Sequence, residues 1–188
     1  MPGVAPDSRV PTFAALRVHI DNWRWQGVPF YLRAGKGLGR RVTEVRVVFK
    51  SIPLCLFGRE DLCVRPEPNV LIIRIQPDEG VALRFSSKVP GEDTTLAPVT
   101  MDFKYSQGFQ KAAPEAYERL LLDAVRGDAT LFARRDEVEH AWRLLDPVIR
   151  ASERDPSHQP TLYPLGSGGP AEAEALPRRD ARAWEPIA

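Results

Sequence analysis

Six strand-like segments precede the first helical segment in this chain of 188 residues. In most of them apolar and polar side chains alternate, which is the pattern of a strand with one buried face. The segments span residues 13–20, 28–32, 43–50, 70–76, 81–87 and 101–105. The turn Pro-Asp-Glu-Gly at 77–80 joins the fourth segment to the fifth, so this pair predicts an antiparallel hairpin.

Helical patterns occur only in the second half of the chain. Pro114 stands at a preferred first-turn position, an apolar face follows it, and a glycine ends the segment. A second helix is predicted over 136–151, where Pro147 should bend or divide it. From Ser152 the chain is rich in Pro, Gly and Ser and predicts an irregular tail. This order predicts one α+β domain over 1–188: a large, mostly antiparallel sheet with helices packed on one face.

Several classes of function are excluded by composition and motif. No Gly-x-Gly-x-x-Gly turn follows a strand and opens a helix, so the sequence predicts no Rossmann domain in this chain. A net charge of +1 gives no reason to expect nucleic acid or a membrane surface as a partner, and no apolar run reaches membrane-span length. Cys55 and Cys63 form neither a disulfide framework nor a zinc pattern. We therefore expect reduced thiols, no metal and a cytoplasmic location.

Cationic side chains cluster in and after residues 24–38, which read Arg-Trp-Gln-Gly-Val-Pro-Phe-Tyr-Leu-Arg-Ala-Gly-Lys-Gly-Leu. Glycines on both sides of Lys36 let the backbone fold closely, and Arg40 and Arg41 follow. Several cations can thus converge on one small anion such as a phosphate. A lone Lys-Gly pair is otherwise most often a solvated turn.

This segment closely resembles the one that opens the C-terminal domain of glucose-6-phosphate dehydrogenases. Further stretches similar to the same family are residues 69–77, 116–124, 127–132 with 136–138, and the tail at 163–170. Their order and spacing fit from near residue 10 to near residue 186, so the resemblance covers almost the whole chain. It implies that Lys36 contacts the phosphate of glucose 6-phosphate and that Arg41 and Gln76 serve the same pocket. From the residues alone, Arg41 is a charge at a strand start and Gln76 a polar residue at a hairpin.

The resemblance also bears on a second, structural NADP that some family members hold on this domain. The positions that align with parts of that site are Arg33, Arg46, Arg74, Arg84, Asp102 and Trp184. Two departures weaken the match to this structural NADP site: Val42 stands where a lysine would be wanted, and Gly168 replaces an arginine of the tail motif. Loss of two phosphate-binding cations removes much of the attraction for a 2′-phosphate.

The coenzyme-binding half of the family carries a Gly-x-x-Gly-Asp-Leu turn and an Asp-His-Tyr-x-Gly-Lys-Glu motif, and neither occurs in this sequence. No residue that could complete a catalytic base stands at a matching spacing from His19, His140 or His158, so the sequence identifies no catalytic residue. Hydride transfer needs a positioned base and a bound nicotinamide. We therefore expect the chain alone to bind no NADP and to be inactive, although the complete enzyme would use NADP in the pentose phosphate pathway.

Three functions remain open at this stage. The first is the substrate-binding and oligomerisation domain of an NADP-dependent glucose-6-phosphate dehydrogenase, assembled as a homodimer or tetramer through the sheet. A separate N-terminal coenzyme-binding half would then be a further partner. The second is a free-standing, non-catalytic domain that dimerises with or regulates the full-length enzyme. The third is a sugar-phosphate binder with no redox role.

Overall fold

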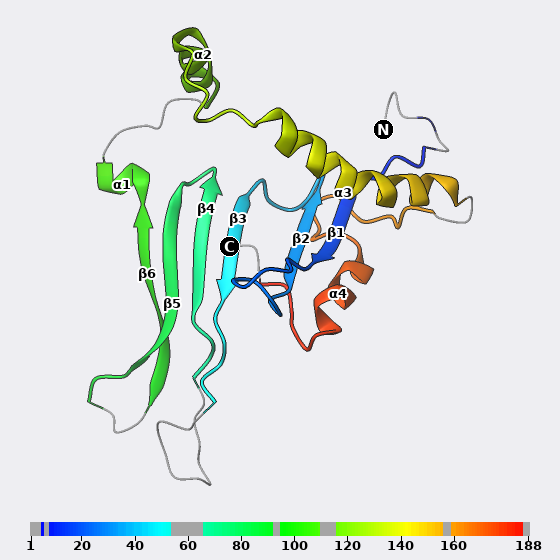
Figure 1. Ribbon diagram of the computed structural model, residues 1–188. Helices are drawn as coiled ribbons and strands as arrows, with labels where there is room; N and C mark the ends of the chain where they lie inside the picture. Colours follow the sequence, from blue (N-terminus) through cyan, green and yellow to red (C-terminus); the bar gives the residue numbers. More distant parts are fainter. Residues whose placement is uncertain are drawn as a thin grey trace. The chain divides into compact units, whose positions relative to one another are not determined.

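The computed structural model describes residues 5, 8–53, 66–91, 95–109, 116–155 and 159–185, and Figure 1 follows the chain through its helices and strands. The chain divides into two compact units, one formed by 1–39 with 114–184 and the other by 40–113 with 185–188. The single domain over 1–188 stays a prediction. Expectations for Cys55, Cys63, Pro114 and His158 lie outside the described residues.

The first unit is built on a two-stranded antiparallel sheet, drawn in blue in Figure 1. Its strands β1 (Phe13–Val18) and β2 (Phe30–Gly35) pair over their whole length, with Phe13 opposite Gly35. Strand β2 begins two residues later than predicted, which agrees with the lack of an amide donor at Pro29. The helices of this unit are α2 (Ala116–Arg126), α3 (Arg135–Arg154), η2 (Ala171–Glu174) and α4 (Ala175–Arg178).

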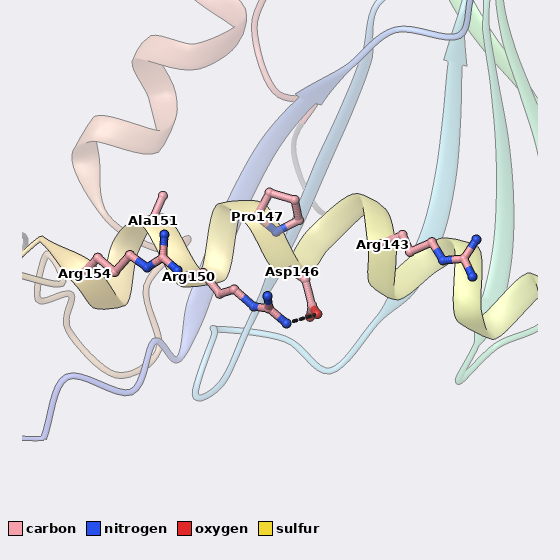
Figure 2. A pocket seen from close by; sticks show the side chains of 6 residues that line it. All are labelled: Arg143, Asp146, Pro147, Arg150, Ala151 and Arg154. Carbon is pink, nitrogen blue, oxygen red and sulfur yellow. Dashed lines mark hydrogen bonds and ion pairs between the residues drawn. The ribbon is translucent and has the colours of Figure 1, made fainter.

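Helix α3 runs without a break through Pro147, so the predicted division into two pieces did not occur (Figure 2). Pro147 has no N–H to donate to the carbonyl oxygen one turn earlier in the helix. No residue of α3 is buried, so water can bind that oxygen instead. No helix in the described ranges is long and apolar enough to cross a membrane.

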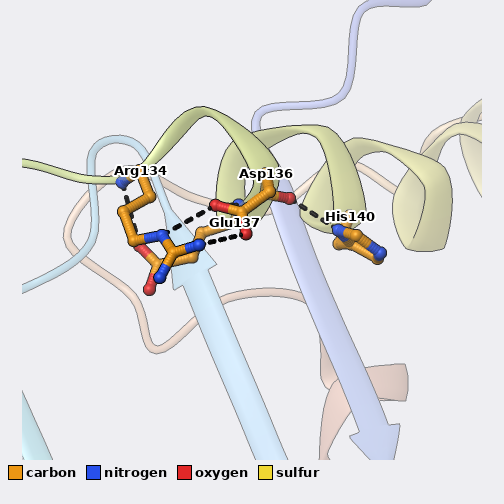
Figure 3. Close-up of polar contacts among 4 residues, drawn as sticks. All are labelled: Arg134, Asp136, Glu137 and His140. Carbon is orange, nitrogen blue, oxygen red and sulfur yellow. Dashed lines mark hydrogen bonds and ion pairs between the residues drawn. The ribbon is translucent and has the colours of Figure 1, made fainter.

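Polar contacts fix the start of α3, as Figure 3 shows. The backbone N–H of Arg134 donates to Glu137 Oε2 at 3.0 Å, and the Arg134 guanidinium binds the Asp136 carboxylate at 2.7 Å. His140 Nδ1 lies 2.6 Å from the carbonyl oxygen of Asp136. Carboxylates in a first turn complement the helix dipole, so Asp136 and Glu137 stabilise the start of α3.

The tail differs from the irregular segment expected from its composition. Helices η2 and α4 form over 171–178, where Ala173 and Pro177 are buried. Trp184 Nε1 donates to the carbonyl oxygen of Ala173 at 2.9 Å and ties the end of the tail to η2. Contacts within the tail, and between α4 and β1, therefore order part of a segment whose local sequence has little periodicity.

The second unit is a four-stranded antiparallel sheet in the order β3-β4-β5-β6. Its elements are β3 (Thr43–Val48), β4 (Val70–Gln76), β5 (Gly80–Lys88), β6 (Leu96–Lys104) and the short helix α1 (Tyr105–Phe109). The predicted hairpin is confirmed, with Arg74 opposite Gly80 beside the turn. Strand β6 begins five residues before the predicted start, because pairing with β5 extends to Leu96. The α+β class is thus confirmed, and the described strands fall into two antiparallel sheets.

The two faces of the four-stranded sheet differ in chemistry. On one face Val70, Ile72 and Ala82 form the buried core cluster of this unit. On the opposite face the register places Val45, Ile73, Val81 and Phe103 in one row across all four strands. Each of these four side chains is 37–47% exposed. The sheet therefore presents an apolar face that the described residues leave uncovered.

Candidate functional site

Lys36 directly follows the last residue of β2 and is held by its backbone. Its N–H donates to the carbonyl oxygen of Thr12 at 2.8 Å. Gly37 then takes a positive φ of 63°, which L-residues with a side chain rarely adopt. The Lys36 side chain is exposed, and its ammonium has no protein partner within the described residues. An ammonium presented to solvent from a fixed backbone suits a point contact with a phosphate.

Arg41 and Gln76 belong to the second unit and lie at one end of the β3-β4 pair. Gln76 is the last residue of β4, and it stands opposite Thr43, the first residue of β3. Its Nε2 donates to Thr43 Oγ1 at 3.0 Å. Arg41 precedes Thr43 by two residues, and both Arg41 and Gln76 are exposed. A guanidinium and an amide at one sheet end supply several donors for a sugar or a phosphate.

The residues aligned with a structural NADP site divide between the two units. Three of the arginines, Arg46, Arg74 and Arg84, lie on the face of the four-stranded sheet that carries its core. Arg74 is two residues from the core residue Ile72 in β4, and Arg84 is two residues from Ala82 in β5. Arg46 is paired with Ile72 across β3 and β4, and residues that are directly paired or two apart point to the same face. Asp102 in β6 joins this face and binds Arg74 Nη2 at 2.8 Å. The structure thus gathers four of the six predicted residues on one surface.

Carboxylates of the chain already match these arginines. Arg46 Nε binds Glu44 Oε1 at 2.7 Å, and Glu185 Oε2 lies 3.0 Å from Arg84 Nη2 and 3.6 Å from Arg46 Nη1. With the Asp102 pair, three guanidiniums face three carboxylates. One donor of each arginine nevertheless stays buried without a partner in the described part of the chain: Arg46 Nη2, Arg74 Nη1 and Arg84 Nε.

Trp184 and Arg33 are also engaged with the protein, within the first unit. The guanidinium carbon of Arg33 lies 4.8 Å from the centre of the Trp184 ring. Tyr31 meets that ring nearly edge-on, with centroids 6.0 Å apart. A nucleotide base would have to displace Arg33 to stack on that face of the ring.

These residues, as they stand, do not fit a dinucleotide phosphate. The three arginines and the three carboxylates carry no net charge together, so an incoming phosphate gains little long-range attraction. Val42 and Gly168 add no cation at the two positions where the sequence departs from the family pattern. A cofactor role for the six residues stays a prediction that the observed pairing does not favour.

A surface hollow runs along α3 (Figure 2). It is lined by Arg143, Asp146, Pro147, Arg150, Ala151 and Arg154. Asp146 already binds Arg150 at 3.1 Å, one turn further along the helix. A single helix forms this hollow, and none of the predicted site residues lines it, so we assign no site there.

The sequence analysis missed three residues that contact predicted site residues. Glu44 binds Arg46, Glu185 binds Arg84, and the Tyr163 hydroxyl donates to the Lys36 carbonyl. Glu185 meets Arg84 across 101 positions of the chain, and the Tyr163 hydroxyl meets the Lys36 carbonyl across 127. No local periodicity marks such long-range partners. The one available signal for Tyr163 is its place at the start of the tail stretch 163–170, which resembles the family.

Comparisons with known proteins bear on this arrangement. Residues 1–185 match the family described as "Glucose-6-phosphate dehydrogenase, C-terminal domain". Glucose-6-phosphate 1-dehydrogenase of Chlamydia pneumoniae is 52% identical over 185 residues, which cover 98% of this chain and 36% of that protein. The enzyme of the same name from Treponema pallidum is 50% identical over 183 residues, which cover 97% of this chain and 35% of that protein.

Solved structures agree with these relatives. The crystal structure of glucose-6-phosphate 1-dehydrogenase from Mycobacterium avium matches 100% of this chain and 38% of its own, with a TM-score of 0.81 at 41% identity. A glucose-6-phosphate dehydrogenase in complex with its substrate glucose 6-phosphate matches 97% of this chain and 37% of its own, with a TM-score of 0.83 at 34% identity. The chain therefore spans little more than a third of the length of these proteins.

Proposed function

The chain belongs to the family of glucose-6-phosphate dehydrogenase C-terminal domains, and we propose that it is the substrate-binding and oligomerisation domain of such an enzyme. The complete enzyme would oxidise glucose 6-phosphate to 6-phosphogluconolactone with NADP, in the pentose phosphate pathway and in the cytoplasm. Family membership over residues 1–185 carries this proposal.

In this function Lys36 binds the phosphate of glucose 6-phosphate. The exposed ammonium and the fixed backbone of Lys36 support this role, because a phosphate contact needs a cation that is not already paired. Arg41, in the second unit, offers the substrate a further cation. Gln76, whose amide also has an acceptor oxygen, binds a sugar hydroxyl.

NADP supplies the hydride acceptor when bound to the complete enzyme. This chain's own residues bind and orient the sugar phosphate, and the base and the coenzyme pocket come from a coenzyme-binding half. Neither motif of that half occurs in this sequence.

The apolar face of the four-stranded sheet is the proposed subunit interface. A second row, formed by Val47, Leu71, Leu83 and Met101, runs beside the row that includes Val45 and Phe103. Met101 is 64% exposed. A contiguous apolar surface of this kind in water favours association, and self-pairing of two copies buries it. A tetramer would need a second interface.

The test of the proposed function is Lys36→Ala in an active glucose-6-phosphate dehydrogenase that contains this chain. Loss of one charge-assisted contact, about 1.5–3 kcal/mol, should raise KM for glucose 6-phosphate about ten- to a hundredfold. Lys88→Ala, at the exposed end of β5, is the matched control and should leave KM unchanged. An unaltered KM in Lys36→Ala would show that Lys36 is only a turn residue and would overturn the proposed phosphate contact.

A further inference from the structure

The turn that carries Lys36 is held by a distant part of the chain, the tail segment 163–167. The hydroxyl oxygen of Tyr163 lies 2.7 Å from the carbonyl oxygen of Lys36 and 3.0 Å from that of Thr12. A tyrosine hydroxyl has one proton to donate, and the shorter distance assigns it chiefly to Lys36. Tyr163 therefore fixes the backbone of the residue whose ammonium is proposed to meet the phosphate.

Two backbone hydrogen bonds extend this contact along the turn. Gly166 N–H donates to the carbonyl oxygen of Gly37 at 2.8 Å, and Gly39 N–H donates to that of Ser167 at 3.0 Å. The Lys36 N–H is also engaged, with Thr12. Both backbone groups of Lys36 thus have partners, whereas its side chain remains exposed to solvent.

The glycines of the turn permit this close approach. A Cβ at Gly37 would lie 2.5 Å from Leu165 Cδ2, and a Cβ at Gly39 would lie 2.7 Å from the carbonyl oxygen of Gly166. Neither distance is compatible with a side chain unless the neighbour moves. The turn therefore packs closely against the tail segment 163–167, with Gly39 against backbone and Gly37 against the Leu165 side chain.

The Tyr163 ring is seated independently of its hydroxyl. Its ring meets Phe13 edge to face, with centroids 5.6 Å apart and planes at 62°. Such aromatic pairs contribute to stability through the rings alone. Tyr163→Phe therefore removes the hydrogen bond to Lys36 and keeps the packing.

We propose that Tyr163 is a positioning residue for Lys36: its hydroxyl holds the Lys36 carbonyl so that the ammonium meets the phosphate of the substrate. This inference rests on the proposed phosphate contact of Lys36. Tyr163 itself touches no reacting atom. It reduces the conformational freedom that the Lys36 turn would lose when substrate binds.

The experiment is a double-mutant cycle of Tyr163→Phe and Lys36→Ala in an active enzyme that contains this chain. Tyr163→Phe should raise KM for glucose 6-phosphate about three- to tenfold with kcat nearly unchanged, because the phosphate contact is made equally in ground and transition states. In the Lys36→Ala background, Tyr163→Phe should change KM no further. Tyr117→Phe, an exposed tyrosine of α2, is the matched control.

Each outcome of the cycle decides a point. If Lys36→Ala raises KM but Tyr163→Phe behaves like the Tyr117→Phe control, the positioning role is overturned and the proposed function stands. If the effects on KM add, or if kcat falls as far as kcat/KM, Tyr163 acts through general stability and the inference fails. If Lys36→Ala leaves KM unchanged, the phosphate contact and the positioning role fail together.

Discussion

Glu185 accepts a hydrogen bond from Arg84 at 3.0 Å and places a carboxylate on the arginine-bearing face of the four-stranded sheet. The same carboxylate lies 3.6 Å from Arg46, whose side chain is only 12% exposed. Desolvated guanidiniums need a counter-ion, since an unpaired buried charge is costly. A residue close to the C-terminal end of the described chain therefore balances two arginines that the family resemblance aligns with parts of a structural NADP site.

Replacement of this counter-ion should weaken the sheet. Glu185→Gln removes the charge and is expected to lower the free energy of unfolding by about 1–2 kcal/mol, measured by thermal or urea denaturation. Glu172→Gln, an exposed carboxylate of η2, serves as the control for this replacement.

NADP should not raise the melting temperature of the unaltered chain, because carboxylates of the chain already pair with its Arg46 and Arg84. A melting temperature that rises with NADP concentration in the unaltered chain would contradict the balanced network.

Alkaline pH should destabilise the first unit through Tyr31. Its hydroxyl donates to Asp180, which also binds Arg17 at 2.8 Å. Burial, with the hydrogen bond to Asp180 and its charge next, raises the pKa of Tyr31 above its ordinary value of 10.0, although Arg17 and Arg182 oppose the shift. The folded state thus favours the protonated phenol. The contribution of the protonated Tyr31 hydroxyl to the free energy of unfolding is present below about pH 10 and is lost as the pH rises through the raised pKa.

Tyr31→Phe tests this sign, because phenylalanine has no proton to lose. Denaturation midpoints measured from pH 8 upward should fall less steeply above about pH 10 in Tyr31→Phe than in the unaltered chain. Tyr117→Phe, at an exposed position of α2, should follow the unaltered chain. Equal slopes for Tyr31→Phe and the unaltered chain would remove Tyr31 from the alkaline transition.

Local chemistry explains which features the sequence predicts well. The alternation in 70–76 and the turn after it specify β4 and the β4-β5 hairpin to the residue at Val70 and Gln76. Lys36 likewise follows a strand end where the glycines indicate a turn. These features depend on neighbours within a few positions, which is the range over which periodicity and turn propensity act.

Partners distant in the sequence explain what was missed. Nothing near Arg84 reveals that Glu185 neutralises it, and nothing near Lys36 reveals Tyr163. The start of β6 at Leu96 depends on pairing with Lys88, not on its own pattern, which includes Pro98. Tertiary pairing overrides local propensity at the start of β6, whereas the two side-chain contacts join residues that no local pattern connects.

A charge on the apolar sheet face should prevent the proposed dimer. Met101→Glu places a carboxylate at a position that is 64% exposed and lies in the row with Leu83. Burying it against a second copy would be costly, so light scattering at micromolar concentration should give the mass of a monomer. Val125→Glu, at an 86% exposed position of α2, should keep the dimer. A clean monomer mass for the unaltered chain would refute the proposed interface.

The last prediction is that this chain alone does not turn over glucose 6-phosphate. Lys36, Arg41 and Gln76 are exposed donors that can bind a sugar phosphate but cannot take up a hydride. A positioned general base typically raises the rate about 10²–10⁴-fold. Neither described histidine is placed as one, because His140 contacts the Asp136 carbonyl at the start of α3 and His19 is an exposed residue after β1. Mixing the purified chain with glucose 6-phosphate and NADP should produce no NADPH absorbance. Activity that appears only when a coenzyme-binding half is added would support the proposed division of labour, whereas steady turnover in proportion to the chain, with host enzyme excluded, would refute it.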